Sequence, residues 1–150
     1  MATNLDLAGR VLDAFMADDL AGDLQSTALA VVLREVAARD FTCAFIGGSA
    51  GEMQTDYYGV EGLLDGWVDW ASAFDRYRIE PDGEPIVAGD TVVGYARQVA
   101  TLRGAASAIE TPAAGVLFFR DGELLRLELH LDREQALRAA GLEPASSNDQ

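Results

Sequence analysis

The sequence has almost none of the residues that build metal centres and disulfides. Cys43 is the only cysteine and His130 the only histidine among 150 residues. A single cysteine cannot form an intramolecular disulfide, and the pair cannot supply the four ligands of a standard structural zinc site. The acidic residues do not follow the spacing of a calcium-binding loop. We therefore expect no metal and no cofactor, and one unpaired cysteine favours a cytoplasmic protein.

Basic residues are also scarce, with 11 against 25 acidic ones and a net charge of −14. This balance repels phosphate backbones and anionic lipids, which argues against nucleic-acid and membrane partners. No apolar run approaches the roughly 20 residues of a membrane helix, and the first residues lack the blocks of a signal peptide. The glycine-rich stretch 47–51 lacks the lysine of a phosphate-binding loop.

Helical periodicity dominates the first half of the chain, and short strands dominate the second half. Thr3 is the expected N-cap of the first helix. The predicted segments are helices over 5–17, 24–38 and 58–75, a strand over 40–46 and a loop over 47–57. The later predicted strands are 77–87, 91–102, 108–120 and 124–131, followed by a short helix that ends near Gly141. We predict one domain over 1–144 and a disordered tail over 145–150.

Asp121-Gly122 separates the last two predicted strands, and both residues tolerate the positive φ of a type I′ hairpin turn. Helices that come before a run of antiparallel strands indicate an α+β fold, in which the helices pack on one face of a curved sheet.

Several short motifs, in this order and spacing, resemble the SnoaL-like branch of the nuclear-transport-factor-2-like (NTF2-like) superfamily. They are Val11-Leu12-Asp13-Ala14-Phe15, Tyr58-Gly59-Val60-Glu61-Gly62, Ala88-Gly89-Asp90-Thr91, Arg120-Asp121-Gly122-Glu123 and Leu131-Asp132-Arg133-Glu134. The resemblance implies a cystatin-like cone, in which a curved antiparallel sheet wraps around three N-terminal helices and a short C-terminal helix follows. It also implies an apolar pocket and a homodimer formed through the outer sheet face.

The superfamily includes ketosteroid isomerases, epoxide hydrolases, polyketide cyclases, dehydratases and non-catalytic binders, so the fold alone does not decide the function. The resemblance places the isomerase tyrosine near Val11 and the isomerase aspartate near Phe45. It places an acid of the epoxide-hydrolase relay at Leu129. All three residues are apolar here, which argues against both chemistries, although a register one residue away would put Glu128 or His130 at the relay position instead.

The strand over 124–131 presents two different faces. Leu125, Leu127, Leu129 and Leu131 alternate with Arg126, Glu128 and His130. If the leucines line the pocket, the polar row lies outside. If the strand is turned the other way, His130 is a candidate acid or base near neutral pH.

Two further polar residues are candidates for chemistry. Arg97 lies in an otherwise apolar strand, where it could hold a carboxylate or carbonyl oxygen, or pair with Glu110 or Glu128 across strands. Glu110 would be a general base if burial raised its pKa, and otherwise a solvent-facing strand residue. Tyr57, Tyr58, Trp67 and Trp70 are the expected pocket lining, with plain core packing as the alternative.

Two functions therefore remain open. The first is a small isomerase, cyclase or hydrolase that acts on a hydrophobic, polyketide- or steroid-like molecule through His130, Arg97 and Glu110. The second is a non-catalytic module that binds an apolar small molecule or forms a dimeric interaction surface. The orientation of the strand over 124–131 separates the two, because it decides which side chains reach the pocket.

Overall fold

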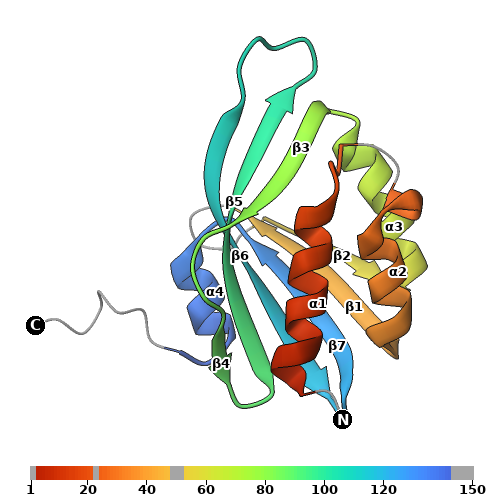
Figure 1. The fold of residues 1–150 in the computed structure, drawn as a ribbon, viewed down its shortest axis with the longest axis vertical. Helices are drawn as coiled ribbons and strands as arrows, with labels where there is room; N and C mark the ends of the chain where they lie inside the picture. The colour runs from red at the N-terminus through yellow and green to blue at the C-terminus, as the bar shows by residue number, and fades with distance from the viewer. Residues whose placement is uncertain (1–2, 22–23, 48–52, 143–150) are drawn as a thin grey trace, which may run out of the picture.

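The computed structural model describes residues 3–21, 24–47 and 53–142 (Figure 1). The helices are α1 Asn4–Ala17, α2 Ala28–Val36, α3 Gly59–Ala71 and α4 Arg133–Ala139, with a 3-10 turn at Leu24–Ser26. The strands are β1 Ala37–Gly47, β2 Met53–Tyr58, β3 Phe74–Pro81, β4 Ile86–Ala88, β5 Thr91–Leu102, β6 Ile109–Arg120 and β7 Glu123–His130. The predicted tail over 145–150 lies outside the described residues.

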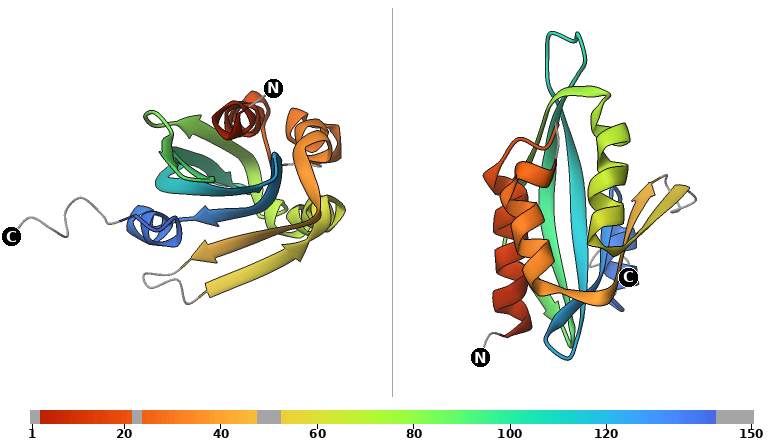
Figure 2. Two further views of the ribbon diagram at one scale, coloured as in Figure 1. Left: turned by 90° about the horizontal axis from the view of Figure 1, so that it is seen from below. Right: turned by 90° about the vertical axis from the view of Figure 1, so that its right-hand side faces the viewer.

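The strands form one curved sheet in the order β2-β1-β7-β6-β5-β3, and β4 pairs with β5. Helices α1 and α3 pack against its concave side, where α2 packs against both of them, while α4 lies on the opposite face against β5, β6 and β7 (Figure 2). The expected α+β cone is therefore confirmed. The sheet is mixed, however, because β1 runs parallel to β7. Hairpin turns indicate only antiparallel neighbours, so no local signal predicts this long-range parallel pair.

Two segments differ from the prediction. Residues 53–58, expected to belong to a loop, form the edge strand β2, which pairs with β1 from Thr42↔Tyr58 to Gly47↔Met53. The second helix is shorter than expected, because the side chain of Thr27 accepts the N–H of Ala30 and starts the helix at Ala28. The helix ends at Val36, and the chain enters β1 at once.

The cap of α1 and the hairpin turn agree with the prediction. Thr3 and Asp6 form a reciprocal capping box at the start of α1, and Asp132 caps α4. Asp121 has a φ of 53° and Gly122 a φ of 81°, as a type I′ turn requires. These local signals fix the start of α1 and the connection between β6 and β7.

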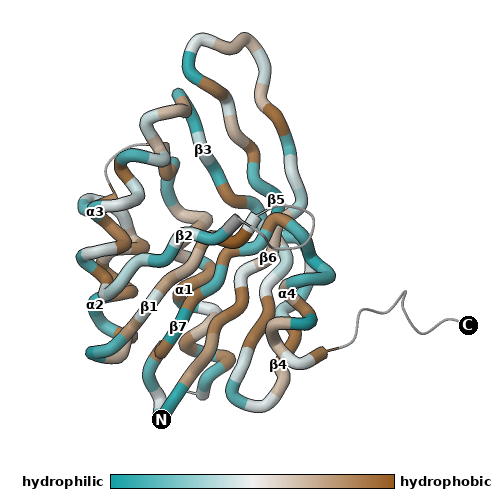
Figure 3. Tube along the Cα trace, turned by 180° about the vertical axis from the view of Figure 1, so that it is seen from behind, coloured by the Kyte–Doolittle hydropathy of each residue, from teal (hydrophilic) through white to brown (hydrophobic). Residues whose placement is uncertain are grey.

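Two hydrophobic clusters lie on opposite faces of the sheet. The larger fills the space between the helices and the concave face, and the smaller joins α4 to Val93, Ala114 and Val116. A hydrophobic stretch accordingly runs through the second half of the central strand β6, whereas hydrophobic and hydrophilic residues alternate along β7 (Figure 3). Among the described residues, no helix is long and apolar enough to span a membrane.

Strand β2 is held against α3 by a contact that leaves no room for a side chain. A Cβ built on Gly66 would lie 2.0 Å from Cε1 of Tyr57, so the tyrosine ring rests directly on the helix backbone. The neighbouring glycine of the same helix, Gly62, has nothing within 4 Å of such a Cβ.

We expect Gly66→Ala to lower the free energy of unfolding by about 1–3 kcal/mol, because the methyl group overlaps the Tyr57 ring. This loss exceeds the gain of up to about 1 kcal/mol that alanine brings to a helix interior. Gly62→Ala is the matched control and should be neutral or stabilising. Urea denaturation of the three proteins measures the difference. Equal stability of the two variants would contradict the packing of Tyr57 on α3.

Candidate functional site

A cavity of about 320 Å³ lies between the concave face of the sheet and helices α1 and α3. Its boundary is largely apolar and includes residues from both helices and six of the strands. These residues are Leu12, Phe15, Met16, Phe45, Ile46, Gly47, Thr55, Tyr57, Trp67, Trp70, Tyr77, Ile79, Gly94, Ala96, Gln98, Ala113, Ala114, Gly115, Leu127, Leu129, His130 and Leu131. The volume is within the range of small-molecule sites.

One wall of the cavity is a cluster of aromatic rings. Phe45 meets Trp67 edge to face with ring centroids 5.2 Å apart, and Trp70 meets Tyr77 in the same way at 4.8 Å. The indole Nε1 of Trp67 donates to the carbonyl oxygen of Leu20 at 2.7 Å, which fixes this ring in the core. Of the four aromatic residues expected at the pocket, Tyr57, Trp67 and Trp70 line it.

Tyr58, the fourth of these residues, lies elsewhere. It is 75% exposed and precedes α3 as its N-terminal flanking residue. Tyr57 borders the cavity, and adjacent strand residues point to opposite faces, so Tyr58 points away from it. Its cross-strand partner Thr42 is on the outer face beside Arg126.

The facing wall is made of very small residues. Gly94 and Ala96 of β5 pair with Gly115 and Ala113 of β6, and all four border the cavity. A Cβ on Gly94 would lie 2.9 Å from Leu12 of α1, whereas a Cβ on Gly115 would make only ordinary contacts, the nearest at 3.8 Å from Leu129. The absence of side chains on this wall creates the space opposite the aromatic rings.

The described polar residues at the cavity are few, namely Thr55, Tyr57, Tyr77, Gln98 and His130. The Tyr77 hydroxyl donates a hydrogen bond to Oε1 of Gln98, and burial raises the pKa of the Tyr77 phenol, which keeps it protonated. No aspartate, glutamate or arginine lies among the described residues that line the cavity. Cys43 is fully buried in the core and does not line the cavity. Burial raises the pKa of its thiol, so it does not supply a thiolate.

The leucine face of β7 is the one that borders the cavity. Leu127 and Leu129 line it, with Leu131 just beyond the strand. The strand alternates, and His130 pairs with Ala114, which belongs to the outer cluster beneath α4. Three residues border the cavity although their side chains point to the outer face of the sheet. They are His130, Ala114 and Ile46. One detail differs from the predicted alternation: the pairing register shifts at Phe118/Phe119, so that Leu124 rather than Leu125 is fully buried.

The polar row of β7 forms a chain of contacts on the outer face. Arg126 donates to Glu128 at 2.8 Å and to the hydroxyl of Thr42 at 3.1 Å, and Nε2 of His130 lies 2.9 Å from Glu128. His130 is only 3% exposed, and its Nδ1 has no hydrogen-bond partner. Burial alone would raise the pKa of Glu128, but the hydrogen bonds from His130 and Arg126 outweigh it and hold this pKa below its ordinary value.

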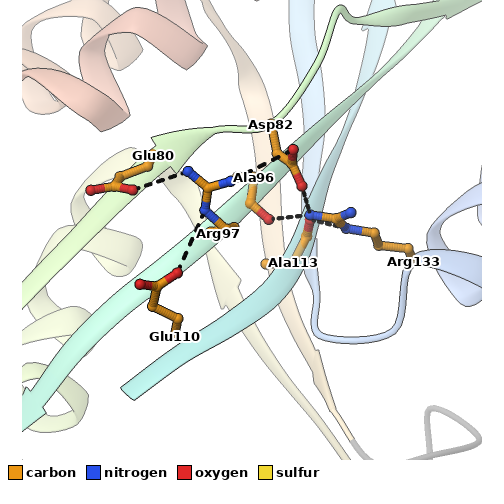
Figure 4. Close-up of polar contacts among 7 residues, drawn as sticks. All are labelled: Glu80, Asp82, Ala96, Arg97, Glu110, Ala113 and Arg133. Atoms are coloured by element: carbon orange, nitrogen blue, oxygen red, sulfur yellow. Dashed lines mark hydrogen bonds and ion pairs between the residues drawn. The ribbon is translucent and has the colours of Figure 1, made fainter. Parts of the chain in front are cut away.

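Arg97 and Glu110 also lie on the outer face, and the structure brings them together. Figure 4 shows Arg97 among three carboxylates, 3.2 Å from Glu80, 3.7 Å from Asp82 and 3.8 Å from Glu110. Asp82 in turn accepts from Arg133 at 2.6 Å, which holds the pKa of the Asp82 carboxyl below its usual range. His130 pairs with Glu128 and makes no hydrogen bond to Arg97 or Glu110.

Arg133 fastens the start of α4 to the back of the cavity wall. Its guanidinium donates to the carbonyl oxygens of Ala96 at 2.8 Å and Ala113 at 3.3 Å, and it lies over the Tyr95 ring at 4.8 Å. The two alanines border the cavity on the other side of the sheet. This network therefore supports the position of the small-residue wall rather than reaching into the cavity.

Sequence reasoning did not single out Tyr77 and Gln98, the two polar side chains that hydrogen-bond to each other at the cavity. The usable signal was the two-residue alternation of β5. If Gly94 and Ala96 face inward, so does Gln98, and Arg97 must face outward. Among the described residues, no group of three or more histidine, cysteine, aspartate or glutamate side chains is placed to hold a metal ion.

No protein-family model and no curated protein matches this sequence. Solved structures do resemble it. A protein of Jannaschia sp. CCS1 assigned as a SnoaL-like polyketide cyclase is 20% identical, with a TM-score of 0.62 over 94% of this chain and 93% of that one. An NTF2-like protein of Burkholderia thailandensis is 17% identical, with a TM-score of 0.65 over 96% and 100% of the two chains.

A third similar structure, from Catenulispora acidiphila, has a ketosteroid isomerase-like fold and was solved in complex with trimethylamine. It is 18% identical, with a TM-score of 0.59 over 94% of this chain and 95% of that one. Likenesses at this level of identity show the fold alone. The chain therefore has the NTF2-like, cystatin-like fold, which agrees with the resemblance read from its motifs.

The Arg126, Glu128 and His130 contacts make the stability of the fold depend on pH. The lowered pKa of Glu128 in the folded state means that its contribution is complete at neutral pH and is lost as the pH falls through that pKa. We expect Glu128→Gln to cost about 1–3 kcal/mol at neutral pH, because hydrogen bonds to a charged group are weakened.

Urea denaturation near neutral pH and again at about pH 3 tests this expectation, since the gap between wild type and variant should close in acid. Glu123→Gln, at an exposed position of the same strand, is the control and should show no gap at either pH. A gap of constant size would mean that the ionised carboxylate of Glu128 is not what stabilises the sheet.

Proposed function

We propose that this protein is a non-catalytic binder of an apolar small molecule, which it holds in the cavity between the sheet and helices α1 and α3. The supporting observation is the composition of the cavity lining. Its described residues carry no carboxylate and no guanidinium, and the chain contains no lysine. The aromatic wall and the small-residue wall together offer two apolar surfaces to a ligand.

Acid and base catalysis is the less favoured function for this geometry. A general acid or base must come within about 2.6–3.2 Å of the substrate atom that it serves, directly or through one water. Arg97 and Glu110 lie on the outer face among Glu80 and Asp82, away from the cavity. His130 borders the cavity, but its side chain alternates to the outer face and is held there by Glu128. Among the similar structures, one is assigned as a polyketide cyclase and another was solved with trimethylamine, so the fold alone does not choose a ligand and the lining of each chain must decide.

A substitution that fills the cavity should abolish binding. We expect Gly115→Val to weaken the affinity for the neutral dye N-phenylnaphthylamine by about tenfold or more, because the new side chain occupies the ligand space. The first atom of that side chain meets only ordinary contacts, so the fold should tolerate it. Dye fluorescence excited by energy transfer from Trp67 and Trp70 measures binding in place, since both tryptophans of the chain line the cavity.

Gly62→Ala serves as the control for this experiment, because a Cβ at that position has nothing within 4 Å and the residue does not line the cavity. It should bind the dye as wild type does. If wild type shows no energy transfer, or if Gly115→Val retains full affinity, the cavity is not a binding site and the proposal fails.

We also propose that two copies associate through the outer face of the sheet, as the resemblance implies. Helix α4 packs over β5, β6 and β7 on that face, and the side chain of Tyr58 is exposed beside Thr42 on the β1–β2 part. An exposed tyrosine next to a strand pair is a typical contact residue of protein interfaces.

Sedimentation velocity at micromolar concentration should show a dimer for wild type and a monomer for Tyr58→Glu. A glutamate at the N-terminus of α3 is favourable for the helix, so the monomer itself should keep its stability. Thermal denaturation of both proteins checks this. A wild-type monomer, or a dimer that is unaffected by Tyr58→Glu, would rule out this interface.

A further inference from the structure

We propose that the side-chain amide N–H of Gln98 is the polar anchor of the cavity, and that it selects an uncharged, ring-containing ligand with a hydrogen-bond acceptor such as a ketone oxygen. The inference rests on the proposed binding function and adds to it the anchoring residue and the class of ligand. The supporting observation is that Gln98 and Tyr77, two polar residues of the described lining, hydrogen-bond to each other at the cavity wall.

The position of Gln98 follows from the register of β5. It pairs with Ile79 of β3 and Thr111 of β6, two residues along from Ala96 on the concave face. Tyr77 lies diagonally across from it on β3, opposite Ala100, and is only 4% exposed. Two neighbouring strands therefore hold the amide and the phenol at fixed positions on the same wall.

The hydrogen bond between the two side chains decides which amide atoms remain available. The Tyr77 hydroxyl donates to Oε1 of Gln98, so one of the two lone pairs of the amide oxygen is already used. Burial raises the pKa of the phenol, which keeps this donor in place at physiological pH. The amide nitrogen makes no hydrogen bond to the described residues and is not among the fully enclosed polar atoms without a partner. Gln98 thus offers the cavity two N–H donors without a partner, beside an oxygen that already accepts one hydrogen bond, so it best complements an acceptor on the ligand.

The rest of the lining argues against a charged ligand. A carboxylate entering the cavity would lose its hydration and find no arginine or lysine among the described lining residues, and the net charge of −14 opposes its approach. A cation would find aromatic rings, but no carboxylate, and it would face the N–H donors of Gln98. The rings moreover contact one another edge to face, at interplanar angles of 89° for Phe45 and Trp67 and 86° for Trp70 and Tyr77.

Four compounds with one bicyclic skeleton separate these possibilities. They are the hydrocarbon tetralin, the ketone tetralone, the corresponding carboxylate and the corresponding trimethylammonium derivative. Calorimetric titration of each into the full-length protein gives four dissociation constants. We expect tetralone to bind about five- to tenfold more tightly than tetralin, the gain of one hydrogen bond, and both ions to bind more weakly than tetralin.

Gln98→Leu removes the amide while keeping a side chain of similar size, and it should reduce the preference for tetralone over tetralin to about one. Undiminished tetralin binding by the variant shows that its cavity is intact. Tyr77→Phe removes only the hydroxyl that positions the amide, and should give an intermediate preference. Gln54→Leu, at an exposed position of β2, is the control and should keep the wild-type preference.

The outcomes distinguish the two levels of the proposal. If none of the four compounds binds, the proposed binding function fails and this inference fails with it. If tetralin and tetralone bind equally, or if Gln98→Leu keeps the preference for the ketone, the cavity binds ligands but Gln98 is not its anchor. Tightest binding by the trimethylammonium compound would overturn the inference in favour of recognition by the aromatic rings.

Discussion

The two-residue alternation of the strands is the constraint on which the site depends, because it decides which side chains can reach the cavity. In β7 it sends Leu127 and Leu129 inward, and Glu128 and His130 outward. In β5 it sends Gln98 inward and Arg97 outward. A shift of the pairing by one residue would exchange these sets, and would bring buried charges to the apolar face. The strand register therefore decides which functional groups face the interior.

A cavity persists inside this small domain because both of its walls are held in place. Protein cores normally close around such gaps, because lost contacts are costly. Here the aromatic rings are held by one another and by the bond from Trp67 to Leu20, so they cannot move toward the glycines and alanines of β5 and β6. On the other side of the sheet, Arg133 binds the carbonyl oxygens of Ala96 and Ala113 and fixes that wall.

The sequence predicted the cap at Thr3 and the turn at Asp121-Gly122, because each depends on neighbours within a few residues. The α+β cone followed from the order of the helices and strands and from the resemblance of the motifs. The sequence did not predict the parallel pairing of β1 with β7, or that residues 53–58 form a strand, since both depend on contacts between distant segments. For the site, residue type singled out His130, Arg97 and Glu110, whereas position on the sheet singles out Gln98 and Tyr77. Ionisable residues attract attention in a sequence, but their face is fixed by a register that turns and bulges can shift by one residue.

A neutral polar pair costs less free energy to bury in an apolar cavity than a charged pair does. A carboxylate placed at Phe45 or Leu129 would need a partner to offset its desolvation, and the described lining has no cation to provide one. The phenol of Tyr77 and the amide of Gln98 satisfy each other at little cost, and the two amide N–H groups remain for a ligand. Such a pair can orient a neutral molecule through one hydrogen bond, whereas a charged pair would add the free-energy cost of desolvating two ions.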